Sequence, residues 1–252
     1  MVRAAELAAK SLMRDFAQLS SLAISEKAPG DFVSSADLAA QEVLFAELSA
    51  AFPDHGFLLE EEAHAGGTMR DARFIVDPLD GTTNFLHGIP HFAVSIALEV
   101  RGEIVAGVVM NPALSELFWA EKHEGSWLGE RRLRVSTPRK VGHAVVGTGI
   151  PHLGRPGQEQ FLQSLAKILP EVAGIRRLGS AALDLAYVAA NRIDVFWEVG
   201  LSPWDIAAGQ LLVKEAGGIV TTCNGEPWGL DSPDILAAAG EPLHRTALRW
   251  LA

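Results

Sequence analysis

The chain has 252 residues, 48% of them hydrophobic and 21% charged, enough to bury the core of one large domain or two modest ones. Disorder, collagen-like repeats and long coiled coils are excluded by this composition. Thirty-one acidic against 21 basic residues give a formal charge of -10, which argues against binding of nucleic acid through a broad basic face and against attraction to anionic membranes.

The cysteine content and the N-terminal segment bear on the compartment. A single cysteine, Cys223, cannot form an internal disulfide or supply a thiolate zinc cage, and this favours a reducing compartment. Charged residues begin at Arg3 and Glu6, so we expect neither a secretion signal nor a membrane span there. The expected location is the cytoplasm.

The first half of the chain has helical patterns followed by strand patterns. Apolar residues recur at helical spacing over 5–19 and 40–51, which predicts two amphipathic helices separated by a polar elbow over 27–35. Phe74 to Val76 predicts a buried strand, and 92–135 alternates apolar and polar residues as an antiparallel meander does. These patterns predict an α+β layer pair.

The second half alternates helix and strand after a Gly- and Pro-rich connector over 142–157. Helices are predicted over 158–169, 181–190 and 205–216, and strands over 174–178, 193–197, 219–222 and 235–238. The alternation predicts an α/β second half, so we expect two domains, 1–140 and 141–252.

The strand at Phe74 leads into the sequence Asp77-Pro78-Leu79-Asp80-Gly81-Thr82-Thr83. In a regular strand the two aspartates would face opposite sides, about 10 Å apart. Pro78 lacks an N–H group, so we expect the strand to end there in a turn that lets both carboxylates point into one space. Gly81 permits close approach of a ligand, and the N–H groups after it could open a helix that binds an anion. Capping of a turn and of a helix by the two aspartates is the alternative.

Three other acidic groups follow predicted strands or begin predicted helices. They are Glu60-Glu61-Glu62 after a short apolar run, Asp37 in Ser34-Ser35-Ala36-Asp37, and Asp205 after Pro203-Trp204. Alone, each is also explained by a solvated loop, a capping box or a helix N-cap. If the groups converge, each pair of like charges about 4 Å apart costs around 4 kcal/mol at an effective dielectric constant of 20. Divalent cations would relieve this cost, and an all-oxygen ligand set selects Mg²⁺, or Mn²⁺ as a substitute, over zinc.

Two segments resemble the signatures of the inositol monophosphatase family of Mg²⁺-dependent, lithium-sensitive phosphomonoesterases. Val76 to Phe85 resembles the first, and Trp204 to Gly209, continuing to Gly218, resembles the second. Order and spacing agree over essentially the whole chain. Leu59, where glycine is frequent, and Ser34, where threonine is frequent, depart from the pattern without removing a ligand. The resemblance implies a layered α-β-α-β-α sugar-phosphatase architecture, a homodimer, and hydrolysis of a small phosphorylated polyol or amino alcohol.

The resemblance also implies roles for individual residues. Metal ligands would be Glu60, Asp77, the Leu79 carbonyl, Asp80 and Asp205. Catalytic residues would be Asp37 and Thr82, which orient and help deprotonate the attacking water, and Glu60, which with waters holds a weaker third metal. Substrate would contact Asp80, Gly81, Thr82, Ala181, Glu198 and Asp205.

The choice of substrate rests on the alcohol side of the site. Relatives in the family hydrolyse inositol phosphates, histidinol phosphate, nucleotide 3'-phosphates or fructose bisphosphate. Glu198 facing a hydroxyl or amine suits the first two, while the short chain and the few basic residues expected near Glu198 disfavour a second phosphate. We expect inositol monophosphate, with histidinol phosphate or a nucleotide 3'-phosphate as alternatives. Bacterial members similar to this chain also bind transcription machinery, which is the alternative from another class.

Overall fold

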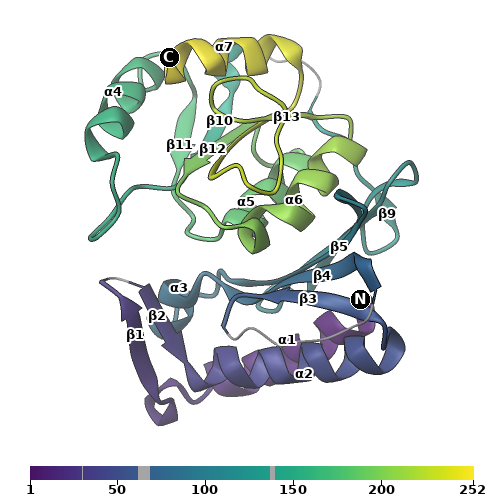
Figure 1. Ribbon diagram of the computed structural model, residues 1–252. Helices are drawn as coiled ribbons and strands as arrows, with labels where there is room; N and C mark the ends of the chain where they lie inside the picture. Colours follow the sequence, from purple (N-terminus) through teal and green to yellow (C-terminus); the bar gives the residue numbers. More distant parts are fainter. Residues whose placement is uncertain (30, 62–68, 137–139) are drawn as a thin grey trace.

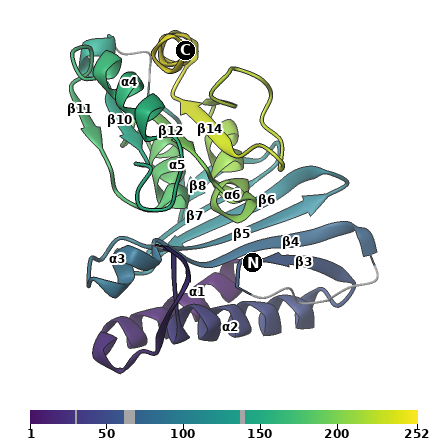
Figure 2. The ribbon, with the colours of Figure 1, turned by 60° about the vertical axis from the view of Figure 1, so that its left-hand side comes forward.

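The computed structural model describes residues 1–29, 31–61, 69–136 and 140–252, so Glu62 lies outside the described residues. Within these ranges the helices and strands stack in five layers, alternately helical and sheet (Figures 1 and 2). This confirms the predicted fold class, an α+β first half joined to an α/β second half in a layered arrangement. No described helix is both long enough and apolar enough to cross a membrane.

The first helical layer consists of α1 (Val2–Phe16) and α2 (Ser35–Ala51), which pack on each other and on one face of the first sheet (Figure 2). Both helices were predicted. The first ends at Phe16 instead of residue 19, where a short 3-10 turn follows (Leu19–Ser21). Ala5, Ala8 and Leu12 are fully buried, and the small alanines allow the two helices to approach closely.

The segment predicted as a polar elbow is a hairpin of β1 (Ile24–Ala28) and β2 (Asp31–Ser34), so that interpretation was wrong. All five residues of β1 are exposed. A strand without a buried face has no apolar alternation, and its sequence therefore gives no signal of period two.

The first sheet has, among the described residues, seven strands in the order β3-β4-β5-β6-β7-β8-β9. Their bounds are β3 His55–Leu59, β4 Met69–Asp80, β5 Ala93–Val100, β6 Glu103–Asn111, β7 Glu116–Glu121, β8 Gly125–Leu128 and β9 Arg131–Arg132. The strands from β4 onward pair antiparallel with their neighbours, as the predicted meander requires. Only β3 pairs parallel, beside β4, and this pairing places its C-terminal end next to that of β4.

The second sheet has the order β11-β10-β12-β14-β13 in the described chain. The strands are β10 Val145–Thr148, β11 Gly174–Arg176, β12 Val195–Val199, β13 Ile219–Thr221 and β14 Asp234–Ala238. Strand β10 lies within 142–157, which the sequence predicts as a connector, so that prediction was wrong for these four residues. It has only four residues, Gly147 among them, and its neighbours on both sides in the sheet come from later in the chain. A strand this short carries no pattern of its own.

Helices α4 (Gln158–Ile168) and α7 (Glu241–Leu251) cover the outer face of the second sheet. Helix α7 was not predicted. Leu243, Ala247 and Trp250 are buried at spacings of four and three, so the helical signal was present in the sequence.

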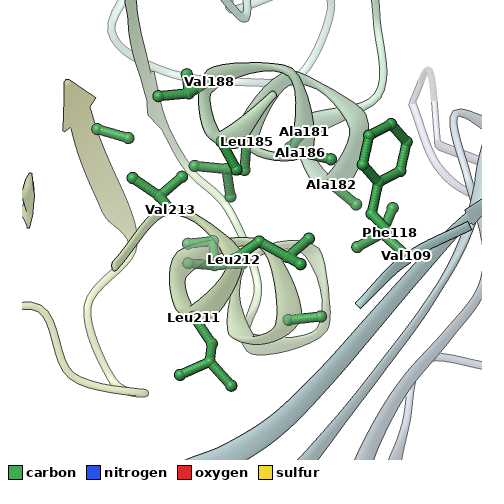
Figure 3. Close-up of a cluster of buried hydrophobic side chains, with 14 of the residues drawn as sticks. Val109, Phe118, Ala181, Ala182, Leu185, Ala186, Val188, Leu211, Leu212 and Val213 are labelled. Carbon is green, nitrogen blue, oxygen red and sulfur yellow. The ribbon is translucent and has the colours of Figure 1, made fainter. Parts of the chain in front are cut away.

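The central layer consists of α5 (Ala181–Ala189) and α6 (Pro203–Glu215), enclosed between the two sheets. Figure 3 shows Phe118 and Val109 of the first sheet against Ala182, with Leu212 of α6 beside α5. Every residue of α5 is buried. Because sheets cover both sides of this layer, the two helices are apolar on nearly every face. Their N-terminal ends remain accessible at the cleft described next.

Candidate functional site

The site begins with an irregularity near the end of β4. Asp77 pairs with Ser95 of β5, whereas Asp80 pairs with Ala93, so three steps on β4 match two on β5. This is a bulge, and the inserted residue brings two side chains three apart onto the same side of the sheet. The prediction that Asp77 and Asp80 share one space is met, but the strand continues through Pro78 instead of ending there in a turn.

Gly81 follows the bulge and begins α3 (Thr82–Leu86). Its φ of +93° lies in the left-handed region, and an added Cβ would lie 3.1 Å from the Gly179 carbonyl oxygen and 3.2 Å from that of His91. Both the backbone conformation and the lack of space therefore require glycine. The predicted short helix after it is present, and Gly81, Thr82 and Thr83 all line the cleft.

Asp205 reaches the same place from α6. Its carboxylate accepts a hydrogen bond from the Ser202 N–H at 2.7 Å, which fixes it at the start of the helix. One carboxylate oxygen each from Asp77, Asp80 and Asp205 lie within 4.8 Å of one another. The structure thus brings together residues from the two halves of the chain that the sequence singled out separately.

Asp77 and Asp80 also have defined hydrogen-bond partners. Asp77 Oδ1 accepts the Leu79 N–H at 2.8 Å, and Asp80 Oδ2 accepts the Ser180 hydroxyl at 2.6 Å and the Ala182 N–H at 2.8 Å. Ser180 and Ala182 belong to the start of α5, so the central layer orients a carboxylate of the first sheet. These bonds hold the carboxylates in fixed orientations without neutralising their charge.

Glu60 lines the cleft beside these aspartates because Leu59 of β3 pairs in parallel with Val76 of β4. It is not part of the group of three. Lys27 Nζ of the hairpin lies 3.1 Å from Glu60 Oε1 and 2.7 Å from Glu61 Oε1. Lys27 was missed in the sequence, since nothing in the exposed strand β1 indicates that its side chain reaches the acidic residues.

Asp37 is buried at the start of α2, outside the cleft lining, and combines the two roles that the sequence left open. Its Oδ2 accepts the Ser34 N–H at 2.9 Å and the Ser34 hydroxyl at 2.6 Å, which closes the capping box. Its Oδ1 lies 3.2 Å from the Thr82 hydroxyl, which also lies 3.0 Å from the Leu79 carbonyl oxygen. Capping therefore leaves one oxygen directed at the site.

Burial dominates the electrostatics of the cluster. It raises the pKa of Asp77 well above the ordinary value, and the charges of Glu60 and the other two aspartates add to the rise. Burial likewise raises the pKa of Asp205, and it raises that of Asp80 to about 6 although the Ser180 hydrogen bond opposes it. Like charges are thus held together in the fold without a compensating cation among the described residues that contact the three aspartates.

The residues present fit a hard divalent cation. All the donors are oxygens, the three carboxylates converge, and burial raises the pKa of Asp77 and Asp205, so that their charged forms are unfavourable without a cation. Leu79 lies in the same bulge and lines the cleft, and its carbonyl oxygen accepts from the Thr82 hydroxyl at 3.0 Å. Asp77, Asp80, Asp205 and Leu79 could hold such an ion, and Glu60 could do so if Lys27 moved away.

The cleft extends from the acidic cluster to Ala181 and Glu198, with a volume of about 770 Å³ including the solvent at its mouth. Burial raises the pKa of Glu198 to about 7, with the charge of Asp80 as the next cause. Arg155 and Arg177 line the same cleft, and their charges act in the opposite direction on Glu198. The expectation of few basic residues near Glu198 was therefore wrong, because both arginines are more than 20 positions away in sequence and the fold brings them there.

The chain is similar to known proteins over most of its length. Residues 1–251 match the family model described as the inositol monophosphatase family. The chain is 54% identical over 249 residues to an inositol-1-monophosphatase of Mesorhizobium japonicum, covering 99% of this chain and 93% of that protein. It is 43% identical over 224 residues to the Nus factor SuhB of Escherichia coli K12, covering 89% and 84%. The crystal structure of the extragenic suppressor protein suhB from Bartonella henselae superimposes with a TM-score of 0.97 at 51% identity, covering 100% of this chain and 96% of that chain.

Proposed function

Because this chain belongs to the inositol monophosphatase family and is a phosphoric monoester hydrolase of that family, we propose that it hydrolyses inositol monophosphate with Mg²⁺ as its metal. One observation carries the proposal. Carboxylates of Asp77, Asp80 and Asp205 converge within 4.8 Å at one end of a cleft whose other end is lined by Ala181 and Glu198. A phosphate placed at the acidic end would leave its alcohol part beside Glu198.

The metal site that we propose comprises Asp77, Asp80, Asp205 and the Leu79 carbonyl, with Glu60 as a further ligand. When bound there, Mg²⁺ supplies a water of lowered pKa and neutralises charge that develops on the leaving oxygen. Mn²⁺ accepts the same oxygen ligands and is the expected substitute.

Thr82 and Asp37 are proposed to direct and deprotonate the attacking water. The Thr82 hydroxyl has one proton, which it donates either to Asp37 Oδ1 or to the Leu79 carbonyl oxygen. When it donates to Asp37, its lone pairs can accept a hydrogen bond from water and so orient that water. Burial raises the pKa of Asp37, which makes its carboxylate a stronger base than an exposed one.

On the substrate side, the backbone N–H groups of Gly81 and Thr82 are proposed to bind phosphate oxygens where α3 begins. Ala181 and Glu198 would contact the alcohol, together with Asp80 and Asp205. A partly protonated Glu198 can both accept from and donate to hydroxyl groups. Arg155 and Arg177 would repel the ammonium group of histidinol phosphate, which favours a polyol as the substrate.

The experiment is a phosphate-release assay on inositol 1-phosphate, histidinol phosphate and adenosine 3'-phosphate, each with Mg²⁺ and with EDTA. We expect the highest kcat/KM for inositol 1-phosphate and loss of activity in EDTA. Faster hydrolysis of histidinol phosphate or of adenosine 3'-phosphate would reject inositol monophosphate as the preferred substrate. Release of phosphate in EDTA at the same rate as in Mg²⁺ would reject the requirement for a metal ion.

A second role is suggested by one relative, the protein named Nus factor SuhB, at 43% identity. We propose association with transcription machinery as an added property of this chain, separate from the cleft. Pull-down of RNA polymerase by the wild type and by an Asp77→Asn variant tests it. Equal capture by both proteins would support a role independent of the metal site, and capture by neither would reject it.

We also propose that the protein acts in the cytoplasm as a homodimer and that its domains divide near residue 140. The single cysteine supports a reducing compartment, and the two sheets, which occupy 55–132 and 145–238, support the division. Sedimentation equilibrium should give twice the chain mass of 26.9 kDa. A mass of one chain would reject the dimer.

A further inference from the structure

Glu198 differs from the aspartates of the cleft in the way its position is fixed. Each of the three converging aspartates accepts a hydrogen bond from a backbone N–H group or from a serine hydroxyl. The carboxyl group of Glu198 forms no hydrogen bond and no ion pair with any residue that the structure describes. Its orientation must therefore come from packing.

The neighbouring strand β10 leaves space on the face from which Glu198 projects. Gly147 of β10 pairs with Phe196 of β12, and the two strands run parallel (Figure 1). Because side chains alternate between the faces of a sheet, Gly149 and Glu198, each two residues further on, lie on the same face as this pair. Glycine occupies both of these positions on the β10 side. The side chains of β12 can therefore lean over the neighbouring chain.

The space at Gly149 is filled by the Glu198 carboxyl group. A Cβ added to Gly149 would overlap Cδ and both carboxyl oxygens of Glu198. Atoms in van der Waals contact lie about 3.5–4.0 Å apart, so Glu198 occupies the volume that a side chain at position 149 would need. The φ of Gly149 is not in the left-handed region. Glycine is therefore required here by space, and the backbone itself would accept alanine.

Electrostatic attraction does not hold Glu198 in this place, because the charges around it oppose one another. Asp80 and the buried Asp184 of α5 are acidic, and both act on Glu198 as like charges. Arg155 and Arg177 are basic and act in the opposite direction. Neither arginine lies close enough to form an ion pair with it within the described ranges. The open space over Gly149 is thus the feature that defines where the carboxyl group lies.

We propose that Gly149 is a positioning residue, which by lacking a side chain lets the Glu198 carboxyl group lie over it and face the hydroxyl groups of the substrate alcohol. The inference rests on the proposed function, because it requires the alcohol to lie beside Glu198. Gly149 also lines the cleft. A side chain at this position would turn Glu198 away, so the preference for a hydroxylated alcohol would be lost. Gly149 takes no part in the chemical step.

The test compares two substrates that share a six-membered carbon ring. Inositol 1-phosphate carries hydroxyl groups on the other ring carbons, and cyclohexyl phosphate carries none. Wild type should have the higher kcat/KM for inositol 1-phosphate. Gly149→Ala should lower the ratio of the two kcat/KM values about tenfold, the effect typical of a lost hydrogen bond to a charged group. The change should lie mainly in KM for inositol 1-phosphate, because the aspartate end of the cleft is unaltered.

A double-mutant cycle shows whether Gly149 acts through Glu198 or through the added methyl group itself. In a Glu198→Ala background, Gly149→Ala should change the ratio by less than about twofold. An effect of Gly149→Ala that stays at full size without the Glu198 side chain would overturn the inference.

Gly147→Ala is the matched control, because it adds a methyl group to the same face of the same strand. The nearest atoms to its Cβ would belong to Ile193 at 3.2 Å, Phe196 at 3.3 Å and Asp184 at 3.4 Å. It should leave the ratio within about twofold of wild type. A loss of preference in Gly147→Ala equal to that in Gly149→Ala would also overturn the inference.

A crystal structure of Gly149→Ala tests the geometry without turnover. The Glu198 carboxyl group should leave its position over residue 149 while β10 stays in place. A shifted strand with an unmoved carboxyl group would contradict the positioning role. Equal hydrolysis of both substrates by wild type, with the carboxyl group displaced in the variant, would reject the proposed substrate and keep the positioning of Glu198. A preference for inositol 1-phosphate that Gly149→Ala leaves intact would keep the proposed function and reject the inference.

Discussion

The Thr82 hydroxyl lies 3.2 Å from Oδ1 of Asp37, a residue 45 positions earlier in the chain. The contact joins the start of α3 to the start of α2, two helices that the bulge of β4 and the capping box of Ser34 hold in place. Both partners have a structural reason for their positions. Their meeting brings together the carboxylate and the hydroxyl that we propose as the base and the group that orients the attacking water.

The first prediction concerns this pair. Thr82→Val keeps the shape of the side chain but removes the hydroxyl, so kcat should fall about a hundredfold while KM changes little. Thr82→Ser keeps the hydroxyl and should retain most of kcat. Steady-state phosphate release from inositol 1-phosphate measures both parameters. Equal activity of the valine and serine variants would remove Thr82 from the mechanism.

The second prediction concerns Asp77. Asp77→Asn removes a charge from the proposed metal site, and turnover should fall by about three orders of magnitude or more. Folding should be little affected, because burial makes the charged form of this carboxyl group unfavourable. Thermal melting in EDTA should therefore give a Tm equal to or above that of wild type. A variant that stays active and metal-dependent would refute the assignment.

The third prediction follows from the raised pKa values of the cleft. The pKa of Asp80 is raised from 3.8 to about 6, and that of Glu198 from 4.5 to about 7. These two carboxyl groups therefore bind protons more tightly in the folded chain than in the unfolded chain. Their contribution to the free energy of unfolding is fully present below the unfolded pKa values and is lost as the pH rises through the folded ones. In EDTA, this contribution should therefore be lost between about pH 4 and pH 7.

Chemical denaturation in EDTA at several pH values measures this loss. Asp80→Asn and Glu198→Gln each remove one titrating group, and each should flatten the pH dependence relative to wild type. Mg²⁺ should restore stability mainly at the upper end of the range, where the carboxylates are charged. Identical pH profiles for wild type and both variants would contradict the assigned pKa shifts.

The fourth prediction concerns Gly81. Gly81→Ala places a Cβ 3.1 Å from the Gly179 carbonyl oxygen in a left-handed conformation, so it should cost more than the 1–2 kcal/mol or so typical of that conformation alone. Gly102→Ala is the control, since Gly102 has a φ of +81° and no atom within 4 Å of the added Cβ. Urea denaturation compares the two. An equal loss of stability in both variants would show that the close approach of Gly81 to Gly179 is unimportant.

The sequence predicted the site better than the path of the chain around it. Asp80 ends β4, Asp77 lies three residues before that end, and Asp205 lies in the first turn of α6. Such positions are visible in sequence because the proline and the helix start give strong local signals. The prediction of a turn at Pro78 was wrong, because the same local sequence is compatible with either a turn or a bulge. They differ only in pairing with β5, which depends on residues far along the chain.

The residues that were missed reach the cleft only through tertiary structure. Arg155 lies in a connector and Arg177 directly follows a three-residue strand, so neither has a local pattern that indicates a site. Lys27 comes from a hairpin whose first strand has no buried face. The signal that could have drawn attention to Arg177 is its place four residues before Ala181, which the resemblance implies as a substrate contact.

We propose that divalent cations bind where carboxylates from both halves of the chain converge. Anomalous diffraction from crystals soaked in Mn²⁺ tests it most directly, because the signal locates the ion independently of activity. We expect Mn²⁺ bound by Asp77, Asp80 and Asp205 at the end of the cleft. Strong Mn²⁺ peaks elsewhere on the protein, with none between these three carboxylates, would contradict it.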